Sequence, residues 1–571
     1  MTTTTTNASS FPAIKPLLAL VLLAFQPLAA QAADVVLPNA GSILKQIPAP
    51  APATPAAKGN GLSIEQTERA ALPVSAPFLV QSLQLSGNTA FDSASLHALV
   101  ADAEGKQLTL QQLDALAARI TAYYQNHGYP LARAIIPAQT ISNGVVQLRV
   151  IEASYGKITL DNRSRVNDPL LKATLAPLQS GQPIAQSALD RSLLLLADVP
   201  GLLVNATLMP GDAVGTSDLL VNANSVPALL GNAVLDNDGS RYTGRVRLGA
   251  TLNFIHPLHQ GDLLTVSALS SGTNMNYGRI AYDTLLDGAG TRAGGSYSDL
   301  SYKLGDTLEA LNGHGNAQVA SLWIKRPLLR SANRNVSAQL QYDRLQLRDH
   351  IDVSAIKNER HLDNWNLNLS GDQRNAWAAN SIFNWTLGWS AGRVSFDDVT
   401  ARTIDAATLG TQGGYSKLSL SLNHLQSLSQ NLTLSLAASG QWTNANLDSS
   451  QKMSIGGAYT VRAYDMGVVS GDMGYLFNAE LRRHMGTLLG GQWQAISFID
   501  TAHVTINQQP GAAQKAASNE VRLSGAGIGA SWAGNNQWAA KLTLAAPLGS
   551  TPALVGHNNS ARLWAEISKN F

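Results

Sequence analysis

The chain of 571 residues contains no cysteine, and only 14% of its residues are charged. The lack of cysteine excludes disulfide bonds and thiol chemistry, and it fits an oxidising periplasm. A soluble domain usually carries nearer a quarter of charged residues, so much of this surface is expected not to face water. Lys and Arg (40) nearly balance Asp and Glu (38). Because a nucleic-acid-binding protein carries a basic footprint, we expect no nucleic-acid partner.

Catalytic and cofactor motifs are also missing. The sequence contains no GxxxxGK[ST] phosphate-binding loop, no HExxH and no GxSxG. The glycine-rich run 525–529 lacks the βαβ context of a dinucleotide-binding fingerprint, and small residues in a crowded strand explain it better. His256 and His259 lie in a turn-like HPLH stretch without a convincing carboxylate partner. We therefore expect no enzyme, no cofactor and no metal site.

Beyond the N-terminal region, the sequence contains no stretch of eighteen apolar residues. At the N-terminus, Lys15 precedes an apolar run over 17–25, and AQA at 30–32 offers a small-x-small cleavage site. These features indicate a secretory signal peptide over residues 1–32. A transmembrane anchor is the alternative, although the run is short for one. A membrane protein without long apolar helices must span as a closed β-barrel, because lipid leaves open sheet edges unsatisfied.

Residues 33–75 combine a short amphipathic segment with a spacer. The segment 40–46, AGSILKQ, has room for a helix of two turns or less. The IPAPAPATPAAKG stretch that follows is rich in proline and alanine and predicts an extended spacer. A plain disordered tail and a functional plug are both compatible with this pattern.

Residues 76–225 show a mixed α/β pattern that occurs twice. Over 76–153 the order is strand, helix, helix, strand, strand, and the second helix begins at Thr109 with a capping box completed by Gln112. The same order recurs in weaker form over 154–225. The predicted strands are 79–85, 132–136, 145–151, 157–160, 204–209 and 218–222, and the predicted helices are 94–103, one from 109, 168–175 and 184–196. Two such units match the POTRA fold, with a single α+β domain as the alternative.

Strict alternation of apolar and polar residues dominates 226–571. Leu248, Ala250 and Leu252 alternate with Arg247, Gly249 and Thr251, and similar runs recur at 335–342, 365–369, 418–422, 432–436 and 538–544. This period places an apolar face outward and a polar face inward. A soluble β-sandwich would show it over fewer and shorter strands. At roughly ten residues per spanning strand plus connections, 226–571 accommodates about sixteen strands.

The chain ends on Phe571, and apolar residues alternate back from it until Lys569 interrupts the pattern. This ending resembles the C-terminal strand signal of outer-membrane barrels. The sequence therefore predicts a transmembrane β-barrel of about 16 antiparallel strands over 226–571, preceded by two α+β POTRA domains at 76–153 and 154–225.

Several motifs follow one another in a recognisable order along most of the chain. They are DVPG at 198–201, PG at 210–211, GTSDL at 215–219, DNDGSRYTG at 236–244, HPL at 256–258, GD at 261–262, RPLLRS at 326–331 and the tetrad Val461, Arg462, Ala463 and Tyr464. Their order and spacing resemble the two-partner secretion transporters, the haemolysin secretion/activation family. The tetrad resembles the VRGY/F motif of POTRA-plus-barrel secretion and assembly proteins, with Ala463 in place of the usual glycine.

The resemblance implies one specific pair of residues. In the family the loop that carries VRGY/F folds back into the barrel, and its arginine pairs with the aspartate of an F-x-D-x-G strand motif. Phe498 and Asp500 match that motif, with Ala502 for the last glycine. A carboxylate facing lipid is costly, so Asp500 should face the lumen, where Arg462 offers a bidentate partner. An exposed loop arginine and a solvated aspartate are the alternative.

The resemblance also implies function. Such transporters lie in the outer membrane, reach it through the barrel-assembly machinery, contact its lipids and work as monomers. They export one large partner that arrives unfolded with an N-terminal secretion domain, and an exposed POTRA sheet edge could accept it as an added strand. Residues 40–46 resemble the family's plug helix. A barrel-insertion machine with more POTRA units and a passive porin without them are the alternatives.

Overall fold

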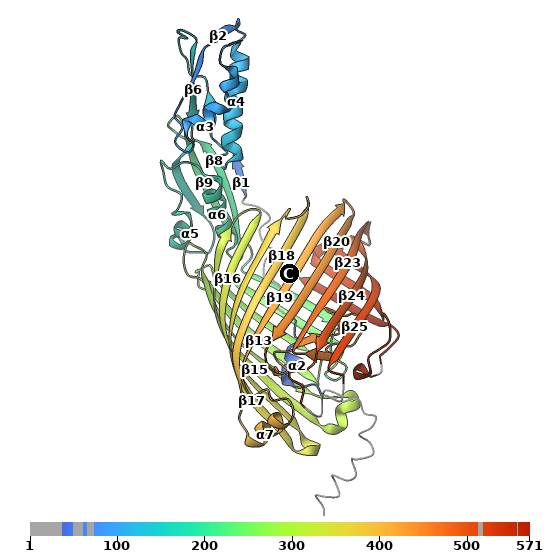
Figure 1. Cartoon of the computed structure of the whole chain (residues 1–571). Helices are drawn as coiled ribbons and strands as arrows, with labels where there is room; N and C mark the ends of the chain where they lie inside the picture. Colours follow the sequence, from blue (N-terminus) through green and yellow to red (C-terminus); the bar gives the residue numbers. More distant parts are fainter. Residues whose placement is uncertain (1–36, 49–60, 65–72, 512–517, 557) are drawn as a thin grey trace, which may run out of the picture.

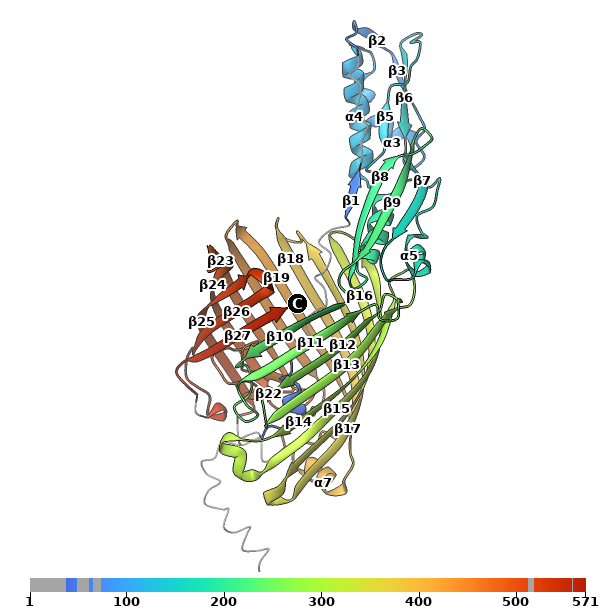
Figure 2. The ribbon, with the colours of Figure 1, turned by 180° about the vertical axis from the view of Figure 1, so that it is seen from behind.

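The computed structural model describes residues 37–48, 61–64, 73–511, 518–556 and 558–571. A closed barrel forms the larger part, and two small α/β domains stand as an arm at one end of it (Figures 1 and 2). The predicted signal peptide, residues 1–32, lies outside the described residues, as does most of the proline-rich spacer. No helix in the described part of the chain is long and apolar enough to cross a membrane.

The barrel confirms the predicted fold class. Sixteen strands pair antiparallel in chain order, and the first closes on the last. The strands are β10 (Leu229–Asp236), β11 (Arg247–Ile255), β12 (Leu263–Ser270), β13 (Met275–Leu285), β14 (Arg292–Lys303), β15 (Gly313–Arg330), β16 (Arg334–Ile351), β17 (Ile356–Arg374), β18 (Ser381–Phe396), β19 (Gly413–Ser429), β20 (Leu432–Thr443), β23 (Met473–Leu488), β24 (Gly491–Thr505), β25 (Glu520–Gly534), β26 (Trp538–Pro547) and β27 (Arg562–Asn570).

The two-residue period sets the two faces of this wall. In β11, Leu248 is 61% exposed on the outer surface, whereas Arg247 is 2% exposed inside. Other strands repeat the pattern, with exposed outer residues that include Leu322, Ile324, Trp365, Leu367, Trp389, Leu542 and Leu563. The outside is therefore an apolar band and the lumen is polar, as a barrel in lipid requires.

The C-terminal residue takes part in closing the barrel. Strands β10 and β27 pair from Asn232↔Asn570 to Asp236↔Glu566, and Phe571 and Gly231 exchange backbone hydrogen bonds of 2.9 and 2.8 Å. Lys569 points outward, and its ammonium contacts the Asn536 carbonyl and lies 5.6 Å from the Trp538 ring. The interrupted alternation at Lys569 is explained by this contact, because a long cationic side chain can reach a polar turn.

The first arm domain is built of β2 (Phe78–Val80), β3 (Ser82–Ser86), α3 (Ser93–Ala98), η1 (Ala101–Ala103), β4 (Lys106–Leu108), α4 (Leu110–Asn126), β5 (Arg133–Ile135) and β6 (Val145–Ile151). Its main sheet has the order β3-β6-β5, and the predicted capping box of Thr109 and Gln112 begins α4. Two predicted elements are shorter than expected. Strand 79–85 is divided at Gln81, whose N–H donates to Gly144 O (2.7 Å), and helix 94–103 is interrupted at Val100, whose backbone is not helical.

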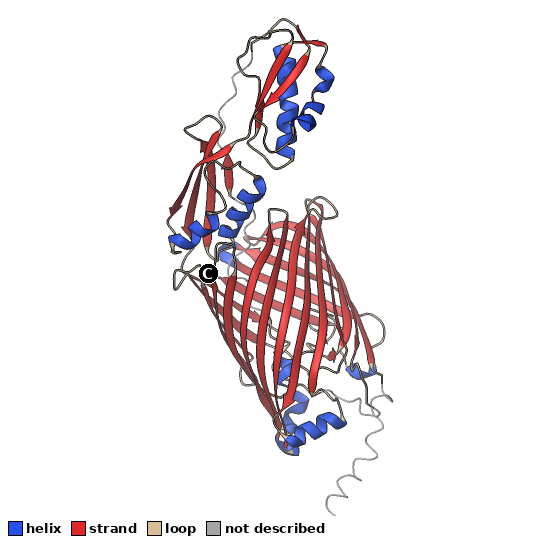
Figure 3. Cartoon of the chain, turned by 60° about the vertical axis from the view of Figure 1, so that its left-hand side comes forward, coloured by secondary structure: helices blue, strands red, loops and turns tan. Residues whose placement is uncertain are grey.

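The second arm domain comprises β7 (Ser154–Asn162), α5 (Asp168–Leu175), α6 (Gln186–Ala197), β8 (Leu202–Pro210) and β9 (Thr216–Ser225). A strand from the N-terminal segment, β1 (Leu62–Ile64), joins its sheet in the order β1-β8-β9-β7. Each arm domain has its own buried apolar cluster. Figure 3 shows the helices packed against the two arm sheets, whereas strands make up the barrel wall.

The second arm domain contacts the barrel rim through Leu285 of β13, which packs into its apolar core, and through several polar groups. Arg330 on β15 makes a bidentate pair with Asp198 (2.6 and 2.7 Å). The Asn167 N–H donates to the carbonyl of His259 (2.9 Å) in the turn after β11. In the same turn His256 is buried. Across the described ranges, no group of three or more His, Asp or Glu side chains is arranged to hold a metal ion.

Candidate functional site

A long loop between β20 and β23, residues 444–472, folds into the barrel lumen. It carries a short hairpin of β21 (Met453–Ile455) and β22 (Val469–Gly471). In the segment that connects β21 to β22, Val461, Ala463 and Tyr464 are buried, and they pack with lumen-facing residues of the wall. These wall residues are Leu476, Ile496, Phe498, Ala502, Val504, Val521, Leu523 and Ala545. The loop is therefore a packed part of the lumen rather than a solvated excursion.

The structure brings Arg462 and Asp500 together. The guanidinium donates from Nε to Oδ2 (2.9 Å) and from Nη2 to Oδ1 (2.8 Å) of Asp500, and the Arg462 backbone N–H also reaches Oδ2 (3.1 Å). Asp500 is fully buried and Arg462 is 6% exposed. A bidentate pair of this kind fixes orientation as well as charge. Because the third bond comes from the loop backbone, the aspartate holds the loop as well as the side chain.

A second carboxylate, absent from the sequence-based hypothesis, completes the charge balance. Glu480 on β23 accepts from Arg462 Nη1 (2.7 Å) and from Arg482 Nε (2.6 Å). Asn478 on the same strand donates to Asp500 Oδ1 (2.7 Å) and to the loop carbonyl of Thr460 (2.8 Å). The spacing of two residues along β23 places Asn478, Glu480 and Arg482 on one face of the strand, and the sequence alone shows this. It does not show which residues of the loop and of β24 they contact.

Two aromatic residues enclose the arginine. The Arg462 guanidinium lies 3.4 Å from the centroid of the Phe498 ring, and Trp564 on β27 donates from Nε1 to the Arg462 carbonyl (2.8 Å). Phe498 thus provides a cation–π face for the predicted arginine, which gives a physical reason for an aromatic residue two positions before Asp500. Trp564 extends the contact to the last strand of the barrel.

Ala463 fits the loop because of a glycine on the wall. Its backbone is not in the left-handed region, so an L-residue is tolerated there. A Cβ added to Gly525 on β25 would lie 2.5 Å from the Ala463 Cβ, which means that the two backbones approach closely at this point. A Cβ added to Gly527 would likewise lie 2.4 Å from the Phe498 ring. The glycine-rich run 525–529 therefore provides space for the loop and for that ring.

Asp465, two residues after Ala463 in the loop, contacts both the first and the last part of the barrel wall. Its Oδ1 accepts from Nη1 of Arg245 (2.7 Å), in the connection between β10 and β11, and lies 2.6 Å from Nη1 of Arg562 at the start of β27. Since β10 and β27 meet at the closure of the barrel, the loop spans that seam. Sequence patterns gave no indication of this contact.

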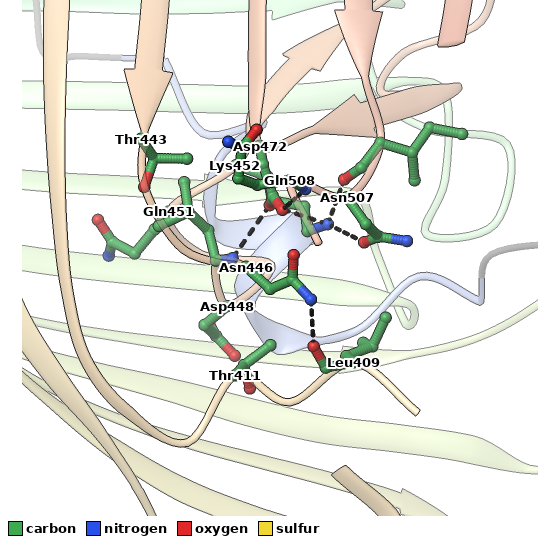
Figure 4. Close-up of polar contacts among 12 residues, drawn as sticks. Leu409, Thr411, Thr443, Asn446, Asp448, Gln451, Lys452, Asp472, Asn507 and Gln508 are labelled. Atoms are coloured by element: carbon green, nitrogen blue, oxygen red, sulfur yellow. Dashed lines mark hydrogen bonds and ion pairs between the residues drawn. The ribbon is translucent and has the colours of Figure 1, made fainter. Parts of the chain in front are cut away.

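A polar cluster anchors the base of the loop (Figure 4). It lies near β22, at the barrel end opposite the arm (Figure 2). Asp472, fully buried, accepts from the N–H of Gln508 (2.8 Å) and pairs with Lys452 Nζ (3.0 Å). Asn446 donates to the carbonyl of Leu409 (2.5 Å) in the loop between β18 and β19. The cluster therefore links the loop 444–472 to two other connections of the same rim. One joins β18 to β19, and the other, which carries Gln508, joins β24 to β25.

The N-terminal segment also lies inside the barrel. Helix α2 (Ala40–Leu44) packs against the inner side of β14, β15 and β16, near the same end as the polar cluster (Figures 1 and 2). Ala40 and Ile43 are fully buried. The helix is shorter than the predicted segment 40–46 but occupies the position of a plug. A polar-walled cavity of about 600 Å³ lies beside it, lined by Lys45, Gln341 and Asn366 among others.

Specific contacts hold α2 in place. The Ala40 N–H donates to Asp349 Oδ1 (2.6 Å), and Asn39 Oδ1 accepts from Ser449 Oγ of the long loop (2.7 Å). Arg360 bridges the two sides, because it pairs with Asp349 (2.7 Å) and with Asp448 (2.5 Å) of the same loop. Plug, loop and wall thus form one polar network in the lumen.

Comparisons with known proteins agree with this architecture. The model of the haemolysin secretion/activation proteins ShlB/FhaC/HecB matches residues 215–532, and that of the ShlB-type POTRA domain matches 78–153. The heme/hemopexin transporter protein HuxB of Haemophilus influenzae is 26% identical over 82% of each chain. The outer membrane transporter CdiB of Dickeya dadantii is 22% identical over 76% of this chain and 77% of that protein.

Solved structures share the fold. CdiB from Escherichia coli superposes with a TM-score of 0.68 at 21% identity, covering 89% of this chain and 93% of that one. BamA from Haemophilus ducreyi lacking POTRA domains 1–3 gives a TM-score of 0.51 at 12% identity over 86% of this chain and all of that one. With a family model matching more than half of its length, the chain belongs to the ShlB/FhaC/HecB family of two-partner secretion transporters in the outer membrane, with its POTRA domains in the periplasm.

Proposed function

We propose that this transporter recognises one dedicated large exoprotein, a haemolysin, an adhesin or a contact-dependent toxin, and passes it unfolded through the barrel. The observation that carries the proposal is the filled lumen. Two separate segments, the loop 444–472 and α2, occupy the pore and share one polar network with the wall. A passive porin has no use for such devices, whereas a pore that opens for one partner needs them.

The mechanism involves no enzymatic step. The partner's N-terminal secretion domain docks as an extended strand on a POTRA sheet edge. The plug and the loop then move aside, and folding of the partner outside the cell gives the transport its direction. The transporter acts as a monomer.

The same proposal covers biogenesis. The apolar outer band contacts outer-membrane lipids, and the barrel-assembly machinery recognises the last strand with Phe571 at its end. Support comes from the outward row of Leu563, Ile567 and Phe571 on that strand, each of which is exposed.

Deletion of the gene tests the proposal directly. One large exoprotein is expected to disappear from the medium, while the total content of outer-membrane barrels stays unchanged. Both quantities are measured in the same cells, with the gene returned on a plasmid as the control. A general fall in barrel proteins would instead indicate an assembly factor.

Substitution of Gly41 tests the plug. A Cβ at this position would lie 2.4 Å from Ser449 Oγ and 2.6 Å from Ser450 N, so Gly41→Val should expel α2. Overpacking costs about 1–3 kcal/mol, which shifts the equilibrium from the plugged to the unplugged barrel by roughly five- to 150-fold. We expect a matching rise in open-channel probability in planar bilayers.

Gly278→Val on β13 is the matched control for this substitution. A Cβ there meets nothing within 4 Å, so the closed channel should be retained. Equal channel activity in the two variants would mean that the contact between Gly41 and the loop does not keep the pore closed.

A further inference from the structure

Two polar cavities follow one another along the same wall of the lumen. The first, of about 770 Å³, lies between α6 of the second arm domain and the barrel wall, and its lining includes Lys325 on β15 and Ser337 on β16. The second is the cavity of about 600 Å³ beside the plug, and its lining includes Trp323 on β15 and Gln339 on β16. These residues occupy consecutive inward-facing positions of the two strands. The cavities therefore lead from the periplasmic mouth toward the plug.

Cations outnumber carboxylates along this wall. The linings of the two cavities together contain seven cations and three carboxylates. The cations are Lys45, Arg279, Arg292, Lys325, Arg330, Arg374 and Lys417, and the carboxylates are Asp198, Asp343 and Asp372. A hollow lined mainly by one sign of charge concentrates ions of the opposite sign. The two cavities are therefore suited to anions.

Three of these cations have no carboxylate partner among the described residues. Arg292 and Arg330 each pair with a carboxylate. No hydrogen bond or ion pair within the described part of the chain involves the side chain of Arg279, Lys325 or Arg374. Their charges therefore face the open volume of the cavities.

The two wall carboxylates are held by amides rather than by these cations. Asp372 accepts from the side-chain amide of Asn335 (2.9 Å). Asp343 accepts from the side-chain amides of Gln341 and Asn366, each at 2.7 Å. The carboxylates are thus part of a neutral hydrogen-bonded lining, and the positive charge of the wall remains in excess.

Cations on the opposite side of the lumen, where the loop 444–472 packs, are paired. Lys452 Nζ and Arg462 Nη2 lie 3.0 and 2.8 Å from carboxylate oxygens. Arg245 and Arg562 share the carboxylate of Asp465. The loop side therefore supplies its own counter-charges, whereas the bare wall leaves cations for a charge that comes from outside the chain.

The cations of the bare wall extend from the mouth to the plug. Arg374 is the last residue of β17, at the periplasmic rim. Lys325 and Arg279 lie five and six residues from the periplasmic ends of β15 and β13. Lys417, which lines the cavity beside the plug, lies twelve residues from the periplasmic end of β19. At about 3.3 Å per residue, an extended chain on this wall passes cations over several turns of its path.

We propose that Arg279, Lys325 and Arg374 form a cationic track that admits exported segments rich in aspartate and glutamate and disfavours segments rich in lysine and arginine. The track rests on the transport function proposed above and specifies the chemistry of the substrate. Opposite charge favours entry of the right chain, and like charge suppresses the wrong one. Small inorganic anions occupy the same positions while no chain is present.

Ion selectivity measures the track without a partner. In the full-length protein, the triple variant Arg279→Gln, Lys325→Gln and Arg374→Gln removes the three charges while keeping polar side chains. In planar bilayers with a KCl gradient, the ratio of chloride to potassium permeability of open channels should fall by about threefold or more. A ratio equal to that of the wild-type protein would overturn the track.

The matched control removes three cations from the outer face of the same barrel. It combines Arg326→Gln, Arg344→Gln and Arg483→Gln, whose side chains are exposed. The permeability ratio of this control should equal that of the wild-type protein. A fall as large as that of the lumen variant would mean that net charge, rather than the track, sets the selectivity, and this would also overturn the proposal.

Export of charged inserts tests the chain itself. The exoprotein whose secretion depends on this gene receives an insert of about twelve residues, either alternating Asp and Ser or alternating Lys and Ser. The wild-type protein should export the aspartate form about tenfold faster than the lysine form, and Lys325→Glu with Arg374→Glu should reverse this order. Heat-modifiable mobility reports the folded barrel of each variant.

The outcomes separate the track from the transport function. Equal export of the two inserts by the wild-type protein, or an order that the charge reversal leaves unchanged, would overturn the track even if the channel prefers chloride, because only small anions would then use these cations. Export of neither the inserts nor the parent exoprotein by the wild-type protein would instead overturn the transport function.

Discussion

Export of the partner is expected to fall at least a hundredfold when Arg462 is replaced by alanine, while the barrel still inserts in the outer membrane. The substitution leaves Asp500 and Glu480 buried without their shared cation. Removing one partner of a buried ion pair costs about 3–5 kcal/mol, which corresponds to a loss of roughly 150- to 5000-fold in the occupancy of the docked loop. Asp500→Ala should act in the same way, because it also removes the acceptor of the Arg462 backbone N–H.

Three controls separate loop docking from general damage. Arg482→Ala removes a cation from the same Glu480, but its side chain is 41% exposed, so export should stay near the wild-type level. Arg462→Lys keeps the charge without the bidentate geometry and should give an intermediate result. Heat-modifiable mobility reports the folded barrel in each case. Normal export by both Arg462→Ala and Asp500→Ala would show that the pair has no part in transport.

The barrel could be predicted from the sequence because its pattern is local. A two-residue period identifies the strand faces whatever the partner strand is, and the number of strands follows from length. Breaks in the pattern had causes that only the fold reveals. Lys569 reaches the Asn536 carbonyl, and Gly525 is small because Ala463 packs on it. Such contacts join residues far apart in the chain, and no periodicity encodes them.

The residues that hold the loop 444–472 in the lumen could be predicted only in part for the same reason. Arg462 and Asp500 followed from a resemblance of motifs, and the cost of a lipid-facing carboxylate placed Asp500 in the lumen. Glu480 lies in an ordinary alternating strand, and its role depends on which loop enters the barrel beside it. Asp465 likewise gains its role from the meeting of the first and last strands.

Deletion of residues 76–225 is expected to leave a folded, membrane-inserted barrel that exports no detectable partner. The barrel closes through its own β10–β27 pairing, and the POTRA cores are separate from it except for Leu285, which packs into the second one. Loss of that contact and of the Asp198–Arg330 pair removes little of what holds the wall together. Export should nevertheless stop, because the proposed mechanism needs a POTRA sheet edge on which the partner docks. The double variant Asp198→Ala with Arg330→Ala, which loosens the arm but keeps the POTRA sheets intact, should retain most of the export. If the deletion variant exported as well as this control, the POTRA domains would have no part in recognition, and the partner would have to enter the barrel unaided.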